Sequence, residues 1–222
     1  MEERLIELFN ISKRYGVTEV LKKIDLTVKE GEFISIRGKS GVGKTTLLKI
    51  IGLLEEPDKG EIRLLGKSIN MLNDNEKSEL RLHYIGFVFQ FFNLIPSLTI
   101  MENIELPLAL AGINKKERKK RVIELLEYFG LTTLAERFPY SLSGGEKQRI
   151  AIVRALVNNP KIILADEPTS SLDDENSELL MELFSKINKE RKVTIVLTTT
   201  DLYEKLPTIM DYVLKEGYLI QH

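Results

Sequence analysis

Eight consecutive residues in the first quarter of the chain have the types and spacing of a phosphate-binding loop. They read Gly38-Lys39-Ser40-Gly41-Val42-Gly43-Lys44-Thr45 and fit the P-loop pattern G-x-x-x-x-G-K-[ST]. The glycines let successive N–H groups point at phosphate oxygens, and a helix that begins near Gly43 adds its positive dipole end. We expect Lys44 to contact the terminal phosphates, the Thr45 hydroxyl to bind Mg²⁺, and Thr46 to complete the nucleotide contacts. The alternative is a simple turn, but a strand before and a helix after favour the phosphate site.

Two adjacent carboxylates, Asp166 and Glu167, follow the short apolar run 162–165. Ligands of open α/β sheets collect at the carboxyl ends of strands, and the P-loop begins at such an end, so the two motifs can meet. We expect Asp166 to hold the magnesium shell and Glu167 to polarise an attacking water. Taken alone, the pair could be an ordinary acidic loop.

A third motif, Ser143 followed by Gly144 and Gly145, stands at the start of a helical pattern. A helix N-terminus of this kind is a second potential anion site. Simple N-capping of the helix by Ser143 is the alternative, and such capping is common.

Short apolar runs rich in β-branched residues predict four buried strands, at residues 33–36, 85–89, 162–165 and 193–197. Helical patterns at 44–54 and 175–192 lie between them, which predicts a mostly parallel sheet with both faces covered. The early segments 5–11 and 24–33 are expected to form antiparallel strands at a sheet edge.

Residues 99–158 interrupt this alternation with helical patterns and no convincing strand. Residues 118–129 are amphipathic, with Val122, Leu125, Leu126 and Phe129 on one side. We therefore expect an α/β fold of the P-loop NTPase type in a single domain, 1–222. Residues 1–90 and 159–222 would form its core, and 91–158 an inserted helical subdomain.

The composition limits the classes of function. Hydrophobic residues make up 43% and charged residues 29%, which predicts a folded domain. The formal net charge of -1 argues against bulk binding to nucleic acid. The chain has no cysteine, which excludes disulfides and thiolate metal sites and fits a reducing compartment. No run approaches the ~20 apolar residues of a membrane span, so a role in a membrane process requires a partner.

The order of the motifs completes a family resemblance. Leu142-Ser143-Gly144-Gly145-Glu146-Lys147-Gln148-Arg149 resembles the signature sequence of ABC ATPases. The P-loop, Gln90, this signature, Asp166-Glu167 and Ser171-Leu172-Asp173 follow in the order of that family, over essentially the whole chain. The segments 87–96 and 102–107 are most similar to the lipoprotein-release and macrolide-export subunits, and a cell-division relative is also similar.

The resemblance implies further roles. Tyr15 would stack on adenine, although it could be a half-buried core aromatic. Gln90 would reach Mg²⁺ and the attacking water, or be a solvated residue at a strand end. Ser143, Gly144 and Gly145 would grip the γ-phosphate bound to the opposite subunit. Asp173 would lie at the dimer seam or simply cap a helix.

One position departs from the family pattern. The family has a His after the last core strand, directly before an Asp, and here Thr200 precedes Asp201. The two histidines, His83 and His222, lie elsewhere in the chain, so a catalytic role at this position falls to Thr200 and slowed hydrolysis is expected.

The resemblance implies an ATP-hydrolysing subunit that uses Mg²⁺, pairs head-to-tail as a homodimer, and works on the inner face of the cell membrane through separate transmembrane permease subunits, with no nucleic acid involved. The apolar segment 91–98 is a candidate docking surface or a buried hinge. A non-transport ABC ATPase of the cell-division type and an ATP-gated clamp with little catalysis are the alternatives.

Overall fold

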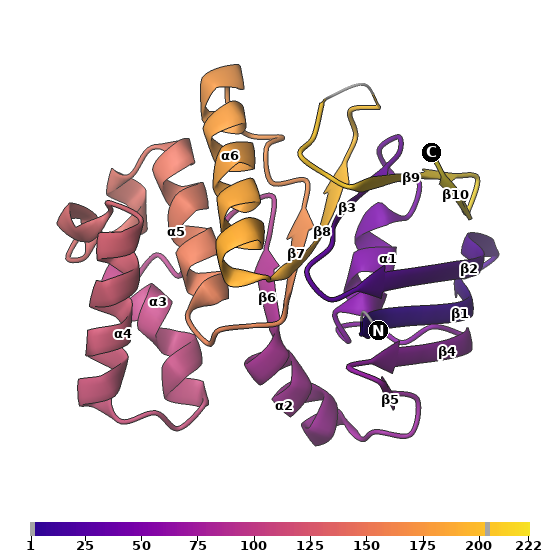
Figure 1. Cartoon of the computed structure of the whole chain (residues 1–222), viewed down its shortest axis with the longest axis horizontal. Helices are drawn as coiled ribbons and strands as arrows, with labels where there is room; N and C mark the ends of the chain where they lie inside the picture. The colour runs from indigo at the N-terminus through magenta and orange to yellow at the C-terminus, as the bar shows by residue number, and fades with distance from the viewer. Residues whose placement is uncertain (1–2, 203–204) are drawn as a thin grey trace.

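The larger of two β-sheets is the frame of the molecule. The computed structural model describes residues 3–202 and 205–222, and its six-stranded sheet has the order β10-β9-β3-β8-β7-β6 (Figure 1). The bounds are β3 (Phe33–Arg37), β6 (Ile85–Val88), β7 (Ile162–Asp166), β8 (Thr194–Thr199), β9 (Met210–Lys215) and β10 (Tyr218–Gln221). All neighbours pair in parallel except β10, which is antiparallel to β9. The expected mostly parallel sheet is confirmed.

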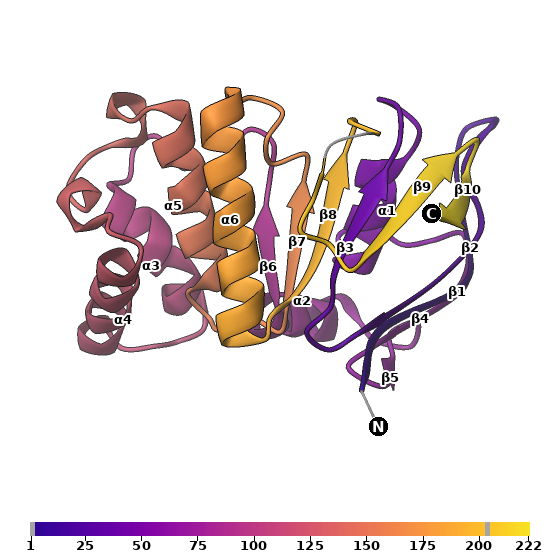
Figure 2. The same ribbon diagram turned by 45° about the horizontal axis from the view of Figure 1, so that its top comes forward.

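Helices cover both faces of this sheet. On one face α1 (Lys44–Ile51) packs Leu47 and Ile50 in one cluster with Ile34 and Ile36 of β3. On the other face α6 (Asp174–Arg191) packs Phe184 in one cluster with Phe33 of β3 (Figure 2). Strands buried on both faces must be apolar along their whole length, which is why the short runs could be recognised in the sequence.

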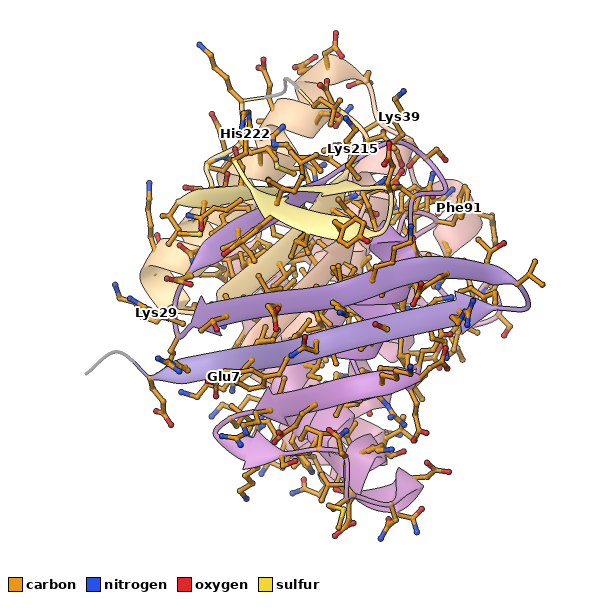
Figure 3. The ribbon with its side chains drawn as sticks, turned by 90° about the vertical axis from the view of Figure 1, so that its right-hand side faces the viewer. Glu7, Lys29, Lys39, Phe91, Lys215 and His222 are labelled. Atoms are coloured by element: carbon orange, nitrogen blue, oxygen red, sulfur yellow. The ribbon has the colours of Figure 1, made fainter. Side chains whose placement is uncertain are left out.

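The second sheet is antiparallel and separate from the first, and it confirms the expected N-terminal antiparallel β region. It has the order β2-β1-β4-β5, with β1 (Arg4–Tyr15), β2 (Thr18–Lys29), β4 (Lys59–Leu64) and β5 (Lys67–Ser68). Glu7 and Lys29 label its two long strands in Figure 3. The expected strand 24–33 is divided by a turn, in which the Glu32 N–H donates to the Lys29 carbonyl (3.2 Å). The chain can therefore pass from one sheet to the other.

Residues 91–158 contain the helical part of the molecule. It comprises α3 (Ile100–Leu110), α4 (Lys115–Tyr128), α5 (Gly144–Leu156) and the short 3₁₀ turns η1 (Thr132–Leu134) and η2 (Pro139–Ser141). Ile104, Val122, Leu126 and Val153 belong to a cluster of their own. The apolar face predicted at 118–129 is the buried face of α4.

One further helix, α2 (Asp74–Tyr84), was not predicted. It buries no residue completely and begins with a capping box between Asn73 and Glu76, so it has no apolar stripe for sequence analysis to find. Within residues 3–202 and 205–222, none of the helices combines the length and the apolarity needed to cross a membrane.

Candidate active site

The P-loop joins the buried strand β3 to the start of α1. Gly43 is the N-cap of α1 with φ 112°, a conformation that side chains other than glycine rarely adopt. A Cβ on Gly43 would also lie 2.6 Å from Val20 Cγ1. No side chain caps α1 and no acidic residue occupies its first turn. The free N–H groups and the positive dipole end are thus left for an anion.

Lys44 lies across the loop with its ammonium buried. Its Nζ donates to the carbonyl oxygens of Gly38 (2.8 Å) and Lys39 (3.1 Å), and it lies 3.1 Å from Glu167 Oε1. Only 4% of Lys44 is exposed, and a buried ammonium requires such partners. Lys44 therefore links the P-loop to the acidic motif directly.

Thr45 and Asp166 meet on the exposed side of the loop. The Thr45 hydroxyl lies 2.9 Å from Asp166 Oδ2 and 3.1 Å from Oδ1. These hard oxygen donors suit Mg²⁺, which is usually held by one or two carboxylates together with substrate phosphates and water. The part of the chain that the structure describes contains no group of three or more His, Cys, Asp or Glu side chains able to hold a metal. The donor set thus fits a Mg²⁺ that arrives with a nucleotide.

Glu167 adopts a left-handed backbone conformation, with φ 44°, which is uncommon outside glycine. Its N–H donates to the carbonyl and the hydroxyl of Thr198, at 3.1 Å each. Its carbonyl accepts from the Ser170 hydroxyl at 2.9 Å. Thr198 was not predicted from the sequence as a site residue. The feature that could have indicated it is the run of three threonines, 198–200, at the end of β8.

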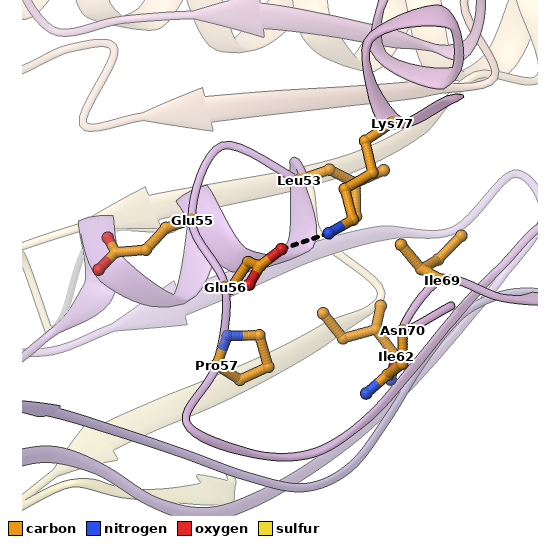
Figure 4. A pocket seen from close by; sticks show the side chains of 8 residues that line it. All are labelled: Leu53, Glu55, Glu56, Pro57, Ile62, Ile69, Asn70 and Lys77. Atoms are coloured by element: carbon orange, nitrogen blue, oxygen red, sulfur yellow. Dashed lines mark hydrogen bonds and ion pairs between the residues drawn. The ribbon is translucent and has the colours of Figure 1, made fainter. Parts of the chain in front are cut away.

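Tyr15 ends β1, and 49% of it is exposed. Its hydroxyl donates to Glu55. Partial burial and this hydrogen bond raise the pKa of Tyr15, so the ring stays neutral at physiological pH. Glu55 points away from the neighbouring ion pair of Glu56 and Lys77 (Figure 4). The pocket beside that pair measures only about 100 Å³, which is too small for a nucleotide.

The signature segment lies at the start of α5, apart from the P-loop. Among the described residues, no hydrogen bond or ion pair joins residues 143–145 to residues 38–46. Ser143 is the N-cap of α5 in a capping box with Glu146, so its capping role is real. A Cβ on Gly145 would lie 2.3 Å from Asn176 Oδ1, so a side chain here would displace the Asn176 side chain at the start of α6.

Gln90 and Asp173 are both associated with the loop between β7 and α6. Gln90 follows β6, is half-buried, and its carbonyl lies 3.4 Å from the Ser171 hydroxyl. Asp173 caps α6 by accepting from the Asn176 N–H at 2.8 Å. The loop between β7 and α6 therefore contacts Gln90. At its end, Asp173 holds Asn176, which lies close to Gly145 at the start of the signature helix α5.

Thr200 is exposed just beyond β8. It lines an open hollow of about 530 Å³ together with Glu167, Thr199 and Asp201. The backbone beside it is anchored, since the buried Arg37 donates to the Asp201 carbonyl at 3.1 Å. His83 lies on α2 beside Glu79, and the His222 N–H donates to the Asp211 carbonyl at the β9–β10 hairpin. Neither histidine lines this hollow.

Comparison with known proteins gives the family. The family model described as ABC transporter matches residues 21–170, which is more than half of the chain. The chain belongs to the ABC transporter family. Within this family it is similar to the lipoprotein-releasing system ATP-binding protein LolD of Bacteroides thetaiotaomicron, with 46% identity over 93% of this chain and 94% of that protein. It is equally similar to the uncharacterized ABC transporter ATP-binding protein MJ0796 of Methanocaldococcus jannaschii, with 47% identity over 89% of this chain and 88% of that one.

Solved ABC transporter structures share the fold. A dimeric post-hydrolysis state of MJ0796 bound to ADP and Pi superimposes with a TM-score of 0.88 at 43% identity, covering 97% of this chain and 96% of that one. The P-loop fold with an antiparallel β region and a helical insertion is thereby confirmed, as is the similarity to the lipoprotein-release group.

Proposed function

We propose that this chain hydrolyses ATP to ADP and phosphate as the ATP-binding subunit of a transporter whose membrane-spanning subunits are separate chains. The observation that carries the proposal is the convergence of two contacting pairs, Lys44 with Glu167 and Thr45 with Asp166, at the uncapped N-terminus of α1. The solved relative bound to ADP and Pi supports the same chemistry.

Each residue has a defined part in this proposal. The amides of residues 38–46 and the Lys44 ammonium bind the phosphates and stabilise the charge that develops on the transferred group. Glu167 lies at the same edge and polarises the attacking water. Thr45, Asp166 and Gln90 would hold Mg²⁺, whose charge would neutralise part of the phosphate charge. Tyr15, half-exposed beyond the loop, stacks on the adenine.

A second copy of the chain completes the site. Among the described residues, Ser143, Gly144 and Gly145 make no hydrogen bond to the P-loop of their own chain, and we propose that they contact the γ-phosphate bound to the partner in a two-fold, head-to-tail dimer. The solved MJ0796 structures are described as dimeric, which supports this arrangement. Thr200 takes the position of the family's histidine, and we propose that hydrolysis is slower as a result.

The permease is proposed to dock where the core meets the helical part. A largely apolar groove of about 670 Å³ runs between α2, β6, α3 and α5 and is lined by Phe89, Ile95 and Leu110 among others. Phe91, beside it, is 73% exposed. This groove divides the proposed core, 1–90 and 159–222, from the proposed subdomain, 91–158. Docking here would hold the chain at the inner face of the membrane.

A phosphate-release assay on the purified chain tests the proposal. Turnover that requires Mg²⁺ and disappears in Lys44→Ala supports an ATPase, whereas ATP binding without turnover would favour the gated clamp. Co-purification from membranes then separates transport from a cell-division role, because only the former requires substrate-translocating subunits in the complex.

A further inference from the structure

The end of β8 contains a hydroxyl that contacts both parts of the acidic motif. The Thr198 hydroxyl donates to Asp166 Oδ1 at 2.7 Å and accepts from the Glu167 N–H at 3.1 Å. Thr198 is fully buried. Its single proton and one lone pair are both used, so the hydroxyl has a defined orientation.

The first consequence concerns Asp166. Its other hydrogen-bond donor among the described residues is the Thr45 hydroxyl, which contacts both carboxylate oxygens. If Thr45 turns to bind a metal, its proton no longer points at Asp166. Thr198 then remains as the donor to the Asp166 carboxylate, at Oδ1.

The second consequence concerns Glu167. Its left-handed backbone, φ 44°, persists only if neighbouring groups hold it. The Thr198 hydroxyl supplies an additional acceptor to the Glu167 N–H beside the Thr198 carbonyl. The direction in which the Glu167 side chain leaves the strand thus depends on this hydroxyl.

We propose that Thr198 is a positioning residue for ATP hydrolysis, which orients the Asp166 carboxylate and the Glu167 backbone without contacting the nucleotide. The proposal rests on the proposed function. In this proposal the hydroxyl holds the Asp166 carboxylate and the Glu167 N–H from behind the residues that contact the nucleotide.

The test compares two threonines of the same strand. Thr198→Val keeps the branched shape and removes the hydroxyl. Thr194→Val is the matched control, because Thr194 is also fully buried in β8 and its hydroxyl also makes hydrogen bonds, to the Gly31 N–H (2.8 Å) and the Lys29 carbonyl. It lies four residues, or about 13 Å, from Thr198.

We expect Thr198→Val to lower kcat about ten- to a hundredfold with an unchanged KM for ATP, since small misplacements of catalytic groups have effects of this size. Thr198→Ser, which keeps the hydroxyl, should restore kcat. Thr194→Val should melt as early as Thr198→Val and keep its kcat. In nucleotide-free protein, amide exchange at Glu167 should accelerate about two- to tenfold in Thr198→Val alone, which corresponds to the loss of one hydrogen bond.

Equal kcat in Thr198→Val and wild type, or equal losses in the Val and Ser variants, would overturn the proposal. Should Thr198→Val fail to fold, Thr198→Ala removes the same hydroxyl without introducing a second methyl group, and the same two comparisons apply. A wild-type chain without turnover would contradict the proposed function instead, and the exchange rate at Glu167 would still decide whether the hydroxyl holds that backbone.

Discussion

The ammonium of Lys44 and the carboxylate of Glu167 form an ion pair at 3.1 Å. Lys44 is almost fully buried, and the Glu167 side chain is 18% exposed. The cation proposed to bind phosphate and the carboxylate proposed to polarise water are therefore direct partners of each other.

Replacement of Lys44 by Ala should weaken ATP binding ten- to a hundredfold, because charge-assisted contacts of this kind contribute roughly 1.5–3 kcal/mol. Calorimetric titration measures the affinity. Lys39→Ala is the control, since Lys39 is exposed at the same loop and its carbonyl, not its side chain, contacts Lys44. Unchanged affinity in Lys44→Ala would remove the phosphate-binding assignment.

The Glu167→Gln variant should form a stable dimer with ATP and Mg²⁺, because the amide keeps the shape of the side chain and cannot act as the base. Light scattering should show the dimer with ATP and the monomer with ADP. If the variant remains monomeric at saturating ATP and high protein concentration, the head-to-tail arrangement loses its main support.

Thr200→His should raise the turnover rate. An imidazole reaches further than the threonine hydroxyl and can carry charge, so it adds one donor to the transferred phosphoryl group. Such a donor contributes roughly 2.7–4 kcal/mol, or about a hundred- to a thousandfold in rate. Steady-state turnover at saturating ATP measures the gain. Rapid turnover of the wild type with no gain in Thr200→His would show that another group fills this role.

Phe91→Ser should release the chain from membranes that contain its permease and leave the melting temperature unchanged, because Phe91 is largely exposed. Leu94→Ser is the contrasting variant. Leu94 packs against the helical core cluster, so its loss should lower the melting temperature. Sedimentation with native membranes measures the first effect, and retained sedimentation of Phe91→Ser would place the docking surface elsewhere.

The carboxyl group of Asp211 makes the free energy of unfolding depend on pH in the acidic range. Partial burial opposes its ionisation, but hydrogen bonds from Ser35 and Thr208 and the charge of Arg37 outweigh burial and lower the pKa of Asp211. A lowered folded-state pKa adds stability above the unfolded value, near 4, which is lost as pH falls through the folded pKa. Chemical denaturation of Asp211→Asn should therefore show a smaller loss of stability between pH 5 and 3, within the range of about 5 to 1 in which such a carboxylate titrates. A loss as large as that of the wild type would assign the acid sensitivity to other carboxylates.

The sequence was sufficient where one physical requirement dominates. Strands buried on both faces must be apolar, and a phosphate cradle needs glycines and a lysine, so β3, β7 and residues 38–45 could be recognised without coordinates. It was insufficient where contacts are long-range. The second sheet depends on pairing between β1 and β4, and β9 pairs with β3 although the two strands are far apart in the chain.

The same distinction holds within the site. Lys44, Asp166 and Glu167 were predicted to meet because strand ends converge at one edge, and the structure brings them together. Thr198 was missed because threonine is common in β-strands, so its presence in one does not by itself indicate a functional role. Only the pairing of β7 with β8 places its hydroxyl between the Asp166 carboxylate and the Glu167 N–H.

The connection between β7 and α6 joins residues proposed to act on the chain's own nucleotide to the start of α6, beside the helix proposed to contact the nucleotide of a partner chain. It begins at Glu167, passes Ser171 beside Gln90, and leads into the first turn of α6, where Asn176 lies close to Gly145. In a head-to-tail dimer, the Glu167 end would lie at the chain's own nucleotide, and the α6 end would lie close to the nucleotide bound to the partner. Fewer than a dozen residues of backbone would then separate the two sites, a length over which a displacement at one nucleotide would affect the other.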